Sequence, residues 1–326
     1  MKMRVGVIGL AGVGRIHINK WLEIAELVSV CDLDSTVLAQ VAKSCQINGY
    51  RNVEQMLDKE DLQAISICTP PKSHLSITQQ VADRGIHVLC EKPMASTVSD
   101  CQAMIDICSR QSVVLQIGHK KRFLPAIQRL KEISEGDFGP IQYIVHRYPH
   151  PGTSNRDWFW AEDDGGGPIL ENAVHAADIL GFLMGDVTRV YAEGGNLLAD
   201  RRSQIDCAVY TLRFASGAIG MVNAGMVSTS QFNFEDYYVA TSAGVAEVKG
   251  KFDSADTIRY SFRSHPDQVE EKSFPNFDSF RAEIEHFVDC IETGAIPLAD
   301  GHSGMKAVAI CRAVKQSSAT GMPIEL

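Results

Sequence analysis

The chain has 326 residues, of which 45% are hydrophobic and 22% charged, and its formal net charge is -9. This is the composition of an ordinary globular protein long enough for two domains, and its acidic balance argues against nucleic acid or an anionic membrane as the main partner. No apolar run approaches the roughly 20 residues that span a bilayer, and the first expected strand begins at Met3, which leaves no room for a signal peptide. We therefore expect a cytoplasmic protein with no membrane partner.

The nine cysteines point to a reducing compartment. They are odd in number and scattered, mostly within apolar segments such as 66–68 and 88–90. That pattern is typical of buried thiols and not of a disulfide framework. No Cys or Cys/His spacing matches a zinc site, so the sequence predicts no metal.

The first predicted element is a strand over residues 3–8, which runs directly into a glycine-rich turn and a helix over 13–25. This order is typical of a dinucleotide-binding unit, because the helix directs backbone N–H groups and the positive end of its dipole at a pyrophosphate. The usual middle glycine of the motif is replaced by alanine, although a glycine follows it. The alternative is a tight strand–helix turn with no ligand. The cofactor contacts predicted here are Gly9, Ala11, Gly12, Val13 and Gly14.

The second predicted strand, 27–31, ends at Asp32, which lies 18 residues after Gly14. An acid at about this spacing accepts hydrogen bonds from the adenosine ribose. Its carboxylate would repel a 2′-phosphate, and residues 33–36 contain no arginine, so NAD is favoured over NADP. The alternative is that Asp32 caps the next helix, a task for which Asp34 or Ser35 is better placed.

Strands and helices continue to alternate up to residue 121. Strands are expected at 64–68, 86–90 and 113–118, with helices at 52–59, 73–84 and 99–110. This alternation predicts an α/β Rossmann domain, a doubly wound parallel sheet, over residues 1–121. Ligands of such sheets bind at the carboxyl ends of the strands. Besides the glycine turn and Asp32, that edge carries Thr69, Pro70, Glu91, Lys92, Pro93 and His119.

Residues 122–326 are expected to form the second domain. A helix over 123–134 and a strand over 141–147 precede a long loop, 148–164, which contains Arg156 and Trp158. Aromatic faces among hydrogen-bonding groups suit a polyhydroxylated ligand. The alternative is a loop that wraps the domain edge, with its tryptophans as packing anchors.

A helix beginning near Pro168 would place Glu171, His175 and Asp178 on one face, four and seven residues apart. Polar residues on one face of an apolar helix form either a solvated surface or a site. The glycine run before this helix favours a site, because it lets another backbone approach closely.

Six further strands with short turns predict a large, open, mostly antiparallel sheet, covered on one face by helices in an α+β domain. They are expected at 187–194, 204–214, 218–226, 234–241, 245–249 and 257–262. The small and apolar residues of 219–224 suggest that a partner subunit covers the other face.

The order of these motifs resembles the glucose–fructose oxidoreductase/inositol dehydrogenase family, often written Gfo/Idh/MocA. The resemblance lies in His17 after the glycine turn, Thr69-Pro70 with His74, Glu91-Lys92-Pro93, segment 118–125 and the glycine-rich helix 165–178. The final helices, 280–293 and 301–320, also match, so the resemblance covers the whole chain.

The resemblance implies that Lys92 and His175 act together on one substrate hydroxyl. It places an acid four residues before the histidine, where Glu171 stands instead of the usual aspartate, so Asn172 is a second candidate for this task. Arg122 is expected to seat the nicotinamide end or bridge the domains. Thr69, Pro70, His74, Glu91 and Lys92 are expected at the cofactor, and Arg156, Trp158, Asn172 and Asp178 at the substrate, with Asp178 orienting or packing. The resemblance also implies a homodimer or homotetramer formed through the second-domain sheet.

Together these features predict an NAD-dependent dehydrogenase acting on a secondary alcohol of a cyclic sugar or polyol. His175 is the expected base, because the pKa of an unperturbed imidazole lies near operating pH, and the Lys92 ammonium would stabilise the developing alkoxide. One alternative is a reductase of another carbonyl or imine substrate, such as a dihydrodiol or a nucleotide sugar. Another is a non-catalytic dinucleotide-sensing regulator, which would need neither Lys92 nor His175.

Overall fold

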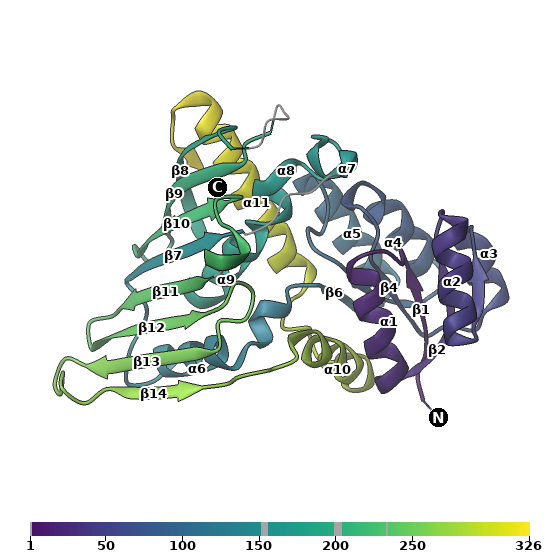
Figure 1. The fold of residues 1–326 in the computed structure, drawn as a ribbon, viewed down its shortest axis with the longest axis horizontal. Coiled ribbons are helices and arrows are strands. Elements are labelled where there is room, and N and C mark those ends of the chain that lie inside the picture. Colours follow the sequence, from purple (N-terminus) through teal and green to yellow (C-terminus); the bar gives the residue numbers. More distant parts are fainter. Residues whose placement is uncertain (1, 151–155, 199–203, 233) are drawn as a thin grey trace. The chain divides into compact units, whose positions relative to one another are not determined.

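The computed structural model describes residues 2–150, 156–198, 204–232 and 234–326. Contacts divide the chain into two compact units (Figure 1): the first is Met1–His119 with Phe280–Met305, and the second is Lys120–Ser279 with Lys306–Leu326. Residues 280–305 therefore belong to the first unit, whereas the sequence prediction placed them with the rest of 122–326. Within the described ranges, no helix combines the length and apolar character needed to cross a bilayer.

The first unit is built on a six-stranded sheet in the order β3-β2-β1-β4-β5-β6, in which every neighbouring pair is parallel. This strand order reverses at β1 and is that of a doubly wound dinucleotide-binding fold, as predicted. The short third strand was not expected from the sequence. The strands are β1 (Arg4–Ile8), β2 (Glu26–Cys31), β3 (Asn48–Tyr50), β4 (Ala64–Ile67), β5 (His87–Cys90) and β6 (Leu115–Ile117).

Helices pack on this sheet through apolar residues that its central strands bury. Val5 and Val7 of β1 are fully buried, and Trp21 of α1 meets Phe287 of α10 edge-on with 6.4 Å between ring centroids. This contact attaches a helix from near the end of the chain to the first helix. The helices are α1 (Val13–Ile24), α2 (Ser35–Cys45), α3 (Val53–Lys59), α4 (His74–Ala82), α5 (Val98–Arg110) and α10 (Ser279–Thr293).

The second unit contains a nine-stranded sheet in the order β14-β13-β12-β11-β7-β10-β9-β8-β15. Its pairs are antiparallel except β7 with β10, which run parallel, so the prediction of a large, mostly antiparallel sheet is confirmed. The last two strands were not predicted. The strands are β7 (Tyr143–Pro149), β8 (Val187–Gly195), β9 (Cys207–Phe214), β10 (Ile219–Gly225), β11 (Glu235–Ala240), β12 (Gly244–Gly250), β13 (Thr257–Phe262), β14 (Glu270–Ser273) and β15 (Ile324–Glu325).

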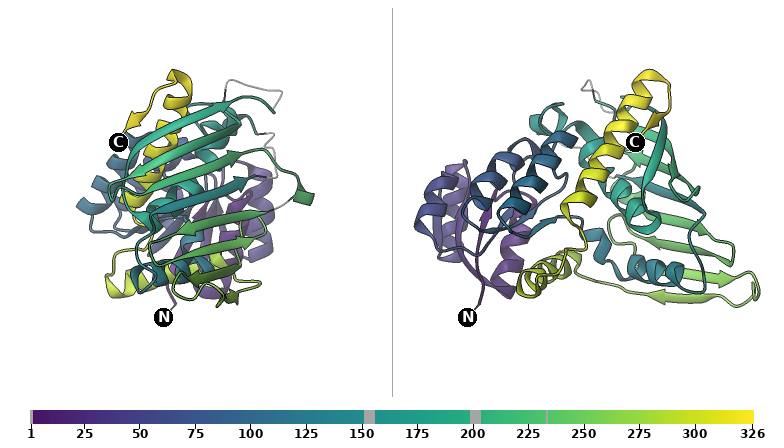
Figure 2. Two further views of the ribbon diagram at one scale, coloured as in Figure 1. Left: turned by 90° about the vertical axis from the view of Figure 1, so that its left-hand side faces the viewer. Right: turned by 180° about the vertical axis from the view of Figure 1, so that it is seen from behind.

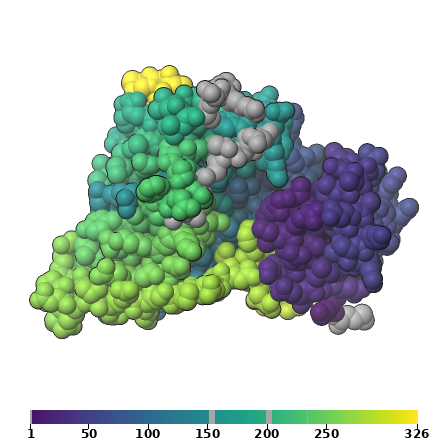
Figure 3. Space-filling model, viewed as in Figure 1, coloured from purple at the N-terminus to yellow at the C-terminus, as the bar shows by residue number. Residues whose placement is uncertain are grey.

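One face of this sheet is covered by helices and the other is open, as the left view of Figure 2 shows. Burial alternates along β9, where Tyr210 and Leu212 are buried but Val209 is 47% exposed. The covering helices include α6 (Pro125–Glu135), α8 (Gly167–Glu171), α9 (Val174–Met184) and the second-unit part of α11 (Gly301–Thr320). At one edge of this sheet, β14 is exposed along its whole length, and Figure 3 shows this edge of the second unit in yellow-green. The arrangement leaves one broad sheet surface without cover from its own unit.

Candidate active site

The glycine turn at the end of β1 leads directly into the N-terminus of α1 in the first unit. Gly9 and Gly12 have φ of 87° and 55°, values that favour glycine. A Cβ on Gly14 would lie 1.9 Å from the carbonyl oxygen of Gly9, so only glycine lets α1 start this close to the turn. The N-terminus of α1 has no side-chain cap and no acidic residue in its first turn. Its backbone N–H groups and dipole therefore suit a pyrophosphate, and the residues present fit a dinucleotide.

Ala11, the departure from the usual glycine pattern, is exposed, whereas Leu10 beside it is fully buried. The additional methyl group is therefore not packed inside the unit, and the turn keeps its form.

Asp32 lies at the end of β2, next to this turn. Its carboxylate accepts hydrogen bonds from the backbone N–H groups of Leu10 at 2.7 Å and Asp34 at 2.9 Å. The alternative that Asp32 caps α2 is wrong, because Asp34 is the cap and accepts from Thr36 and Val37. Asp32 thus joins the glycine turn to the end of the neighbouring strand.

Sequence reasoning missed one cation near this acid. Arg51 follows β3 and donates from Nη2 to the carbonyl oxygen of Leu33 at 3.2 Å. Because β3 pairs with β2, residue 51 lies beside the segment after Asp32 although it is distant in sequence. Nothing in the local sequence around Arg51 indicates this position, because it depends on the pairing of β3 with β2.

The loops after β4 and β5 are joined by His74. Its ring nitrogens lie 2.8 Å from the carbonyl oxygen of Thr69 and 3.1 Å from that of Met94. Burial lowers the pKa of this imidazole, although both carbonyl contacts act in the opposite direction. Ser73 donates to Thr69 Oγ1 at 2.7 Å and so stiffens the same loop. His74 therefore shapes the edge on which Thr69 and Pro70 lie, and its contact with the cofactor stays a prediction.

Glu91 and Lys92 follow directly after β5. Lys92 is partly buried, and Glu91 is only 4% exposed. The Glu91 carboxylate lies 3.0 Å from Nε2 of His17 and accepts a hydrogen bond from the backbone N–H of Lys92 at 3.1 Å. The role predicted for Glu91 toward the cofactor is not tested by these contacts.

In the second unit the predicted helix from Pro168 is interrupted. Glu171 ends α8, and α9 begins at Val174. The N–H groups of both Asn172 and Ala173 donate to the carbonyl oxygen of Pro168, at 2.9 and 3.1 Å, which places a wider turn in the helix. The expectation of one continuous helix is therefore wrong, and a shared face for the three polar residues stays a prediction. Glu171 lies on one helix, and His175 and Asp178 lie three residues apart on the next.

Asp178 is paired with Arg122 inside this unit. Arg122 donates from Nε to both carboxylate oxygens at 3.0 Å and from Nη2 to Oδ1 at 2.7 Å. Its guanidinium also lies 5.0 Å from the ring centroid of Phe182. This geometry agrees with an orienting and packing role for Asp178. Glu171 and His175 are also buried, at 6% and 7% exposure.

The loop predicted over 148–164 contains a short helix, α7 (Asp157–Trp160). Residues 151–155 lie outside the described part of the chain. Trp158 packs against Phe159, Trp160 and Met226, so it anchors this segment. Arg156 is exposed and lies 6.0 Å above the Trp158 ring. Their predicted contact with substrate is not tested by this packing.

One unit is a parallel sheet with a glycine turn suited to phosphate and an acid after the next strand, and the second unit is built on an open sheet. This combination indicates a two-domain dinucleotide-binding protein. Residues 3–119 match a family model described as "Oxidoreductase family, NAD-binding Rossmann fold", and residues 127–247 match "GFO/IDH/MocA C-terminal domain". The chain belongs to the GFO/IDH/MocA family of oxidoreductases, and its cofactor is a nicotinamide dinucleotide.

Relatives align with the chain over nearly its whole length. It is 27% identical to D-xylose 1-dehydrogenase (NADP(+)) 2 of Haloferax volcanii, over 99% of this chain and 100% of that protein. It is 25% identical to myo-inositol 2-dehydrogenase of Thermotoga maritima, over 97% and 96%. Among solved structures, the WlbA dehydrogenase of Bordetella pertussis, in complex with NADH and UDP-GlcNAcA, is 25% identical with a TM-score of 0.86, covering 100% of this chain and 99% of that one.

Proposed function

We propose that this protein is a dehydrogenase that transfers a hydride between a secondary alcohol of a cyclic sugar or polyol and a nicotinamide cofactor. The observation that carries the proposal is the position of Lys92 after β5, at the same edge of a parallel sheet as the glycine turn and Asp32. Full-length similarity to sugar and polyol dehydrogenases supports the substrate class.

The proposed chemistry divides between side chains of the two units. The bound cofactor supplies the hydride acceptor or donor. His175 takes the proton of the substrate hydroxyl during oxidation, and the Lys92 ammonium stabilises the negative charge that develops on that oxygen. Glu171 or Asn172 orients the imidazole or relays its proton, and Arg156 and Trp158 contact the sugar. In the reverse direction His175 returns the proton to the carbonyl oxygen.

Within the cofactor class we propose that NAD is preferred. The Asp32 carboxylate would accept hydrogen bonds from ribose hydroxyls and repel a 2′-phosphate. Arg51 acts in the opposite sense, because its guanidinium lies beside Leu33 and would attract a phosphate. The acid is nearer the glycine turn, since it bonds Leu10 directly.

The test is a panel of inositols, polyols and aldoses with NAD and with NADP, read by reduced-cofactor absorbance, and a matching panel of ketoses with NADH. On the best panel substrate, Lys92→Met and His175→Asn should each lose about 10²-fold or more in kcat while NADH binding survives. Lys43→Met, a change at an exposed lysine of α2, is the matched control and should keep full activity. Unchanged turnover in both site variants would show that the roles are misassigned. NADH binding without turnover on any panel compound would favour the regulatory alternative.

We also propose that the open face of the nine-stranded sheet is a subunit interface. It exposes Tyr191, Val209, Ile219, Met221 and Tyr238, each by more than a third. An apolar sheet face of this size is seldom left in water. Light scattering should find a dimer or tetramer that Met221→Glu dissociates. A wild-type monomer at micromolar concentration would contradict the interface.

A further inference from the structure

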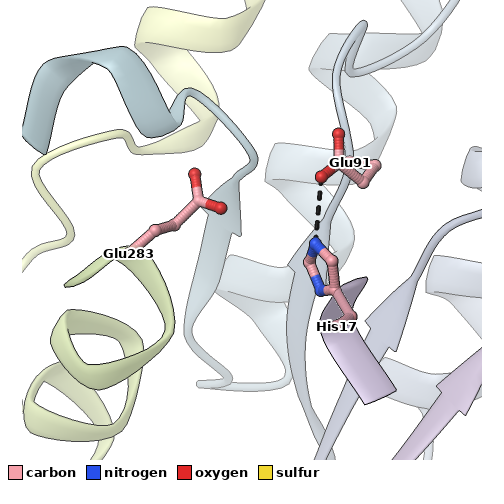
Figure 4. Close-up of side chains that lie close together, drawn as sticks. All are labelled: His17, Glu91 and Glu283. Carbon is pink, nitrogen blue, oxygen red and sulfur yellow. Dashed lines mark hydrogen bonds and ion pairs between the residues drawn. The ribbon is translucent and has the colours of Figure 1, made fainter. Parts of the chain in front are cut away.

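Three buried side chains from distant parts of the sequence meet inside the first unit. His17 comes from α1, Glu91 from the end of β5 and Glu283 from α10, and Figure 4 shows all three side chains directed toward one another. One ligand atom from each lies within 4.8 Å of the others. Their exposures are 0%, 4% and 0%. Such a group in the interior needs an arrangement of hydrogen bonds that compensates for lost hydration.

A series of consecutive hydrogen bonds connects this group to Trp21 and Ser66. The indole N–H of Trp21 donates to Ser66 Oγ at 2.7 Å, and this oxygen lies 3.0 Å from Nδ1 of His17. Because a carboxylate only accepts, the hydrogen of the imidazole is assigned to Nε2, which faces Glu91, and Nδ1 then accepts the hydroxyl hydrogen of Ser66. His17 then carries a proton on Nε2 and donates it to Glu91 Oε1 at 3.0 Å.

The other oxygen of Glu91 fixes the backbone of the next residue. Glu91 Oε2 accepts from the N–H of Lys92 at 3.1 Å, so one carboxylate connects the imidazole to the peptide group that leads into Lys92. Hydrogen bonds to an ionised acceptor are stronger than neutral ones. The side chain of Glu91 is thereby held against its own backbone at the point where β5 ends.

The helix α10 contacts the imidazole from a second side. The Phe280 ring lies edge-on to His17 with 5.9 Å between centroids. The carbonyl oxygen of Glu283 accepts from Gln116 Nε2 at 2.9 Å, which attaches this part of α10 to β6. The His17 ring therefore has little freedom to rotate away from Glu91.

We propose that His17 is a positioning residue for Lys92: through Glu91 it fixes the backbone from which the lysine side chain extends. This inference rests on the proposed role of Lys92 in the reaction. Removing the Nε2 donor takes one charge-assisted hydrogen bond from a buried carboxylate, and Glu91 then loses the contact that keeps it aligned with the Lys92 N–H. Displacements of about 1 Å at a reacting group are enough to lower turnover up to about 10²-fold.

The rival interpretation is a divalent cation bound by His17, Glu91 and Glu283. An imidazole nitrogen and two carboxylate oxygens are suitable ligands for such an ion. A cation would occupy the lone pair of Nε2, whereas the hydrogen-bonded arrangement needs a proton there. The two arrangements therefore exclude each other and predict different metal contents for the purified protein.

The experiment compares three variants of the full chain on the best panel substrate. His17→Leu removes the donor, and His17→Gln keeps an N–H donor that can reach Glu91. His87→Leu is the matched control: His87 begins the same strand β5 and accepts from the N–H of Val114 at 2.9 Å, at the opposite end from Lys92. Measured quantities are kcat, KM, the NADH dissociation constant, Tm and metal content.

We expect His17→Leu to lower kcat about tenfold or more with the NADH dissociation constant within about threefold of wild type. His17→Gln should restore kcat to within about threefold, and His87→Leu should lower Tm without lowering kcat. Unchanged kcat in His17→Leu, no recovery in His17→Gln or an equal loss in His87→Leu would overturn the inference. One equivalent of divalent metal in wild type, lost in His17→Leu, would overturn it in favour of the cation.

The Lys92→Met variant separates this inference from the proposed function. If Lys92→Met is inactive and His17→Leu is fully active, the positioning role is wrong and the proposed function stands. If Lys92→Met keeps full turnover, the proposed role of the lysine is wrong and there is no catalytic lysine for His17 to position.

Discussion

The buried ion pair between Arg122 and Asp178 allows a stability prediction whose size follows from the geometry. Their side chains are 8% and 1% exposed, and three donor–acceptor distances of 2.7–3.0 Å join them. Removing one partner of such a pair typically costs about 3–5 kcal/mol, because the other charge stays buried. We therefore expect Asp178→Ala to lower the free energy of unfolding by about this amount. For domains of 150–250 residues, this corresponds to a fall in Tm of about 6–20 °C.

The double variant Arg122→Met/Asp178→Leu tests the cause of that loss. Replacing both charges by apolar side chains of similar volume removes the uncompensated ion, and such exchanges are often close to neutral. The assay is calorimetry together with urea denaturation of wild type, both single variants and the double variant. A loss below about 1 kcal/mol in Asp178→Ala would refute the reasoning. A double variant as unstable as the sum of the two singles would refute it as well.

Two further predictions concern acid stability and cofactor choice. Burial lowers the pKa of His146 to about 4 from 6.5, although Glu235 nearby raises it. The unfolded chain therefore binds a proton that the folded chain does not, so stability should fall by about 3 kcal/mol as pH decreases from about 6.5 to about 4, with no contribution from this group above pH 7. Urea titrations should show that His146→Phe flattens this slope, and an unchanged slope would contradict the assignment. Asp32→Ser should improve NADPH affinity about tenfold or more relative to NADH, and adding Arg51→Ala should remove that gain; fluorescence titrations giving both variants the same NADPH affinity would show that Arg51 plays no part.

Much of the first unit follows from local sequence. The apolar run before Gly9 predicts a strand, and the glycines after it predict a turn that leads into a helix. The structure contains all three, and each depends on the backbone preferences of its own residues. Asp34 caps α2, one of the two residues that sequence reasoning preferred for that task. Such features depend on neighbours within a few residues, which is why they can be recognised without a fold.

The interruption between α8 and α9 shows where local reasoning fails. The spacing of Glu171, His175 and Asp178 matched a regular helix, but two consecutive N–H groups share the carbonyl oxygen of Pro168. The spacing of apolar residues does not reveal a single wider turn, because the segments before and after that turn each keep helical spacing. The long loop before it likewise contains α7, whose apolar residues find packing partners as distant as Met226.

The sequence by itself determined the local pieces of this protein: the glycine turn after the first strand, Asp32 after the second, Lys92 after the fifth and the helical segment around His175. Only the tertiary structure decided which distant residues meet. His17 bonds Glu91, which is 74 positions away in the sequence. Arg51 donates to Leu33 because β3 pairs with β2. Phe287 of α10 packs against Trp21 of α1. The physical reason is that strand order and helix docking are set by the apolar surface that the whole unit buries. That total depends on all segments together, so it cannot be read from any one of them.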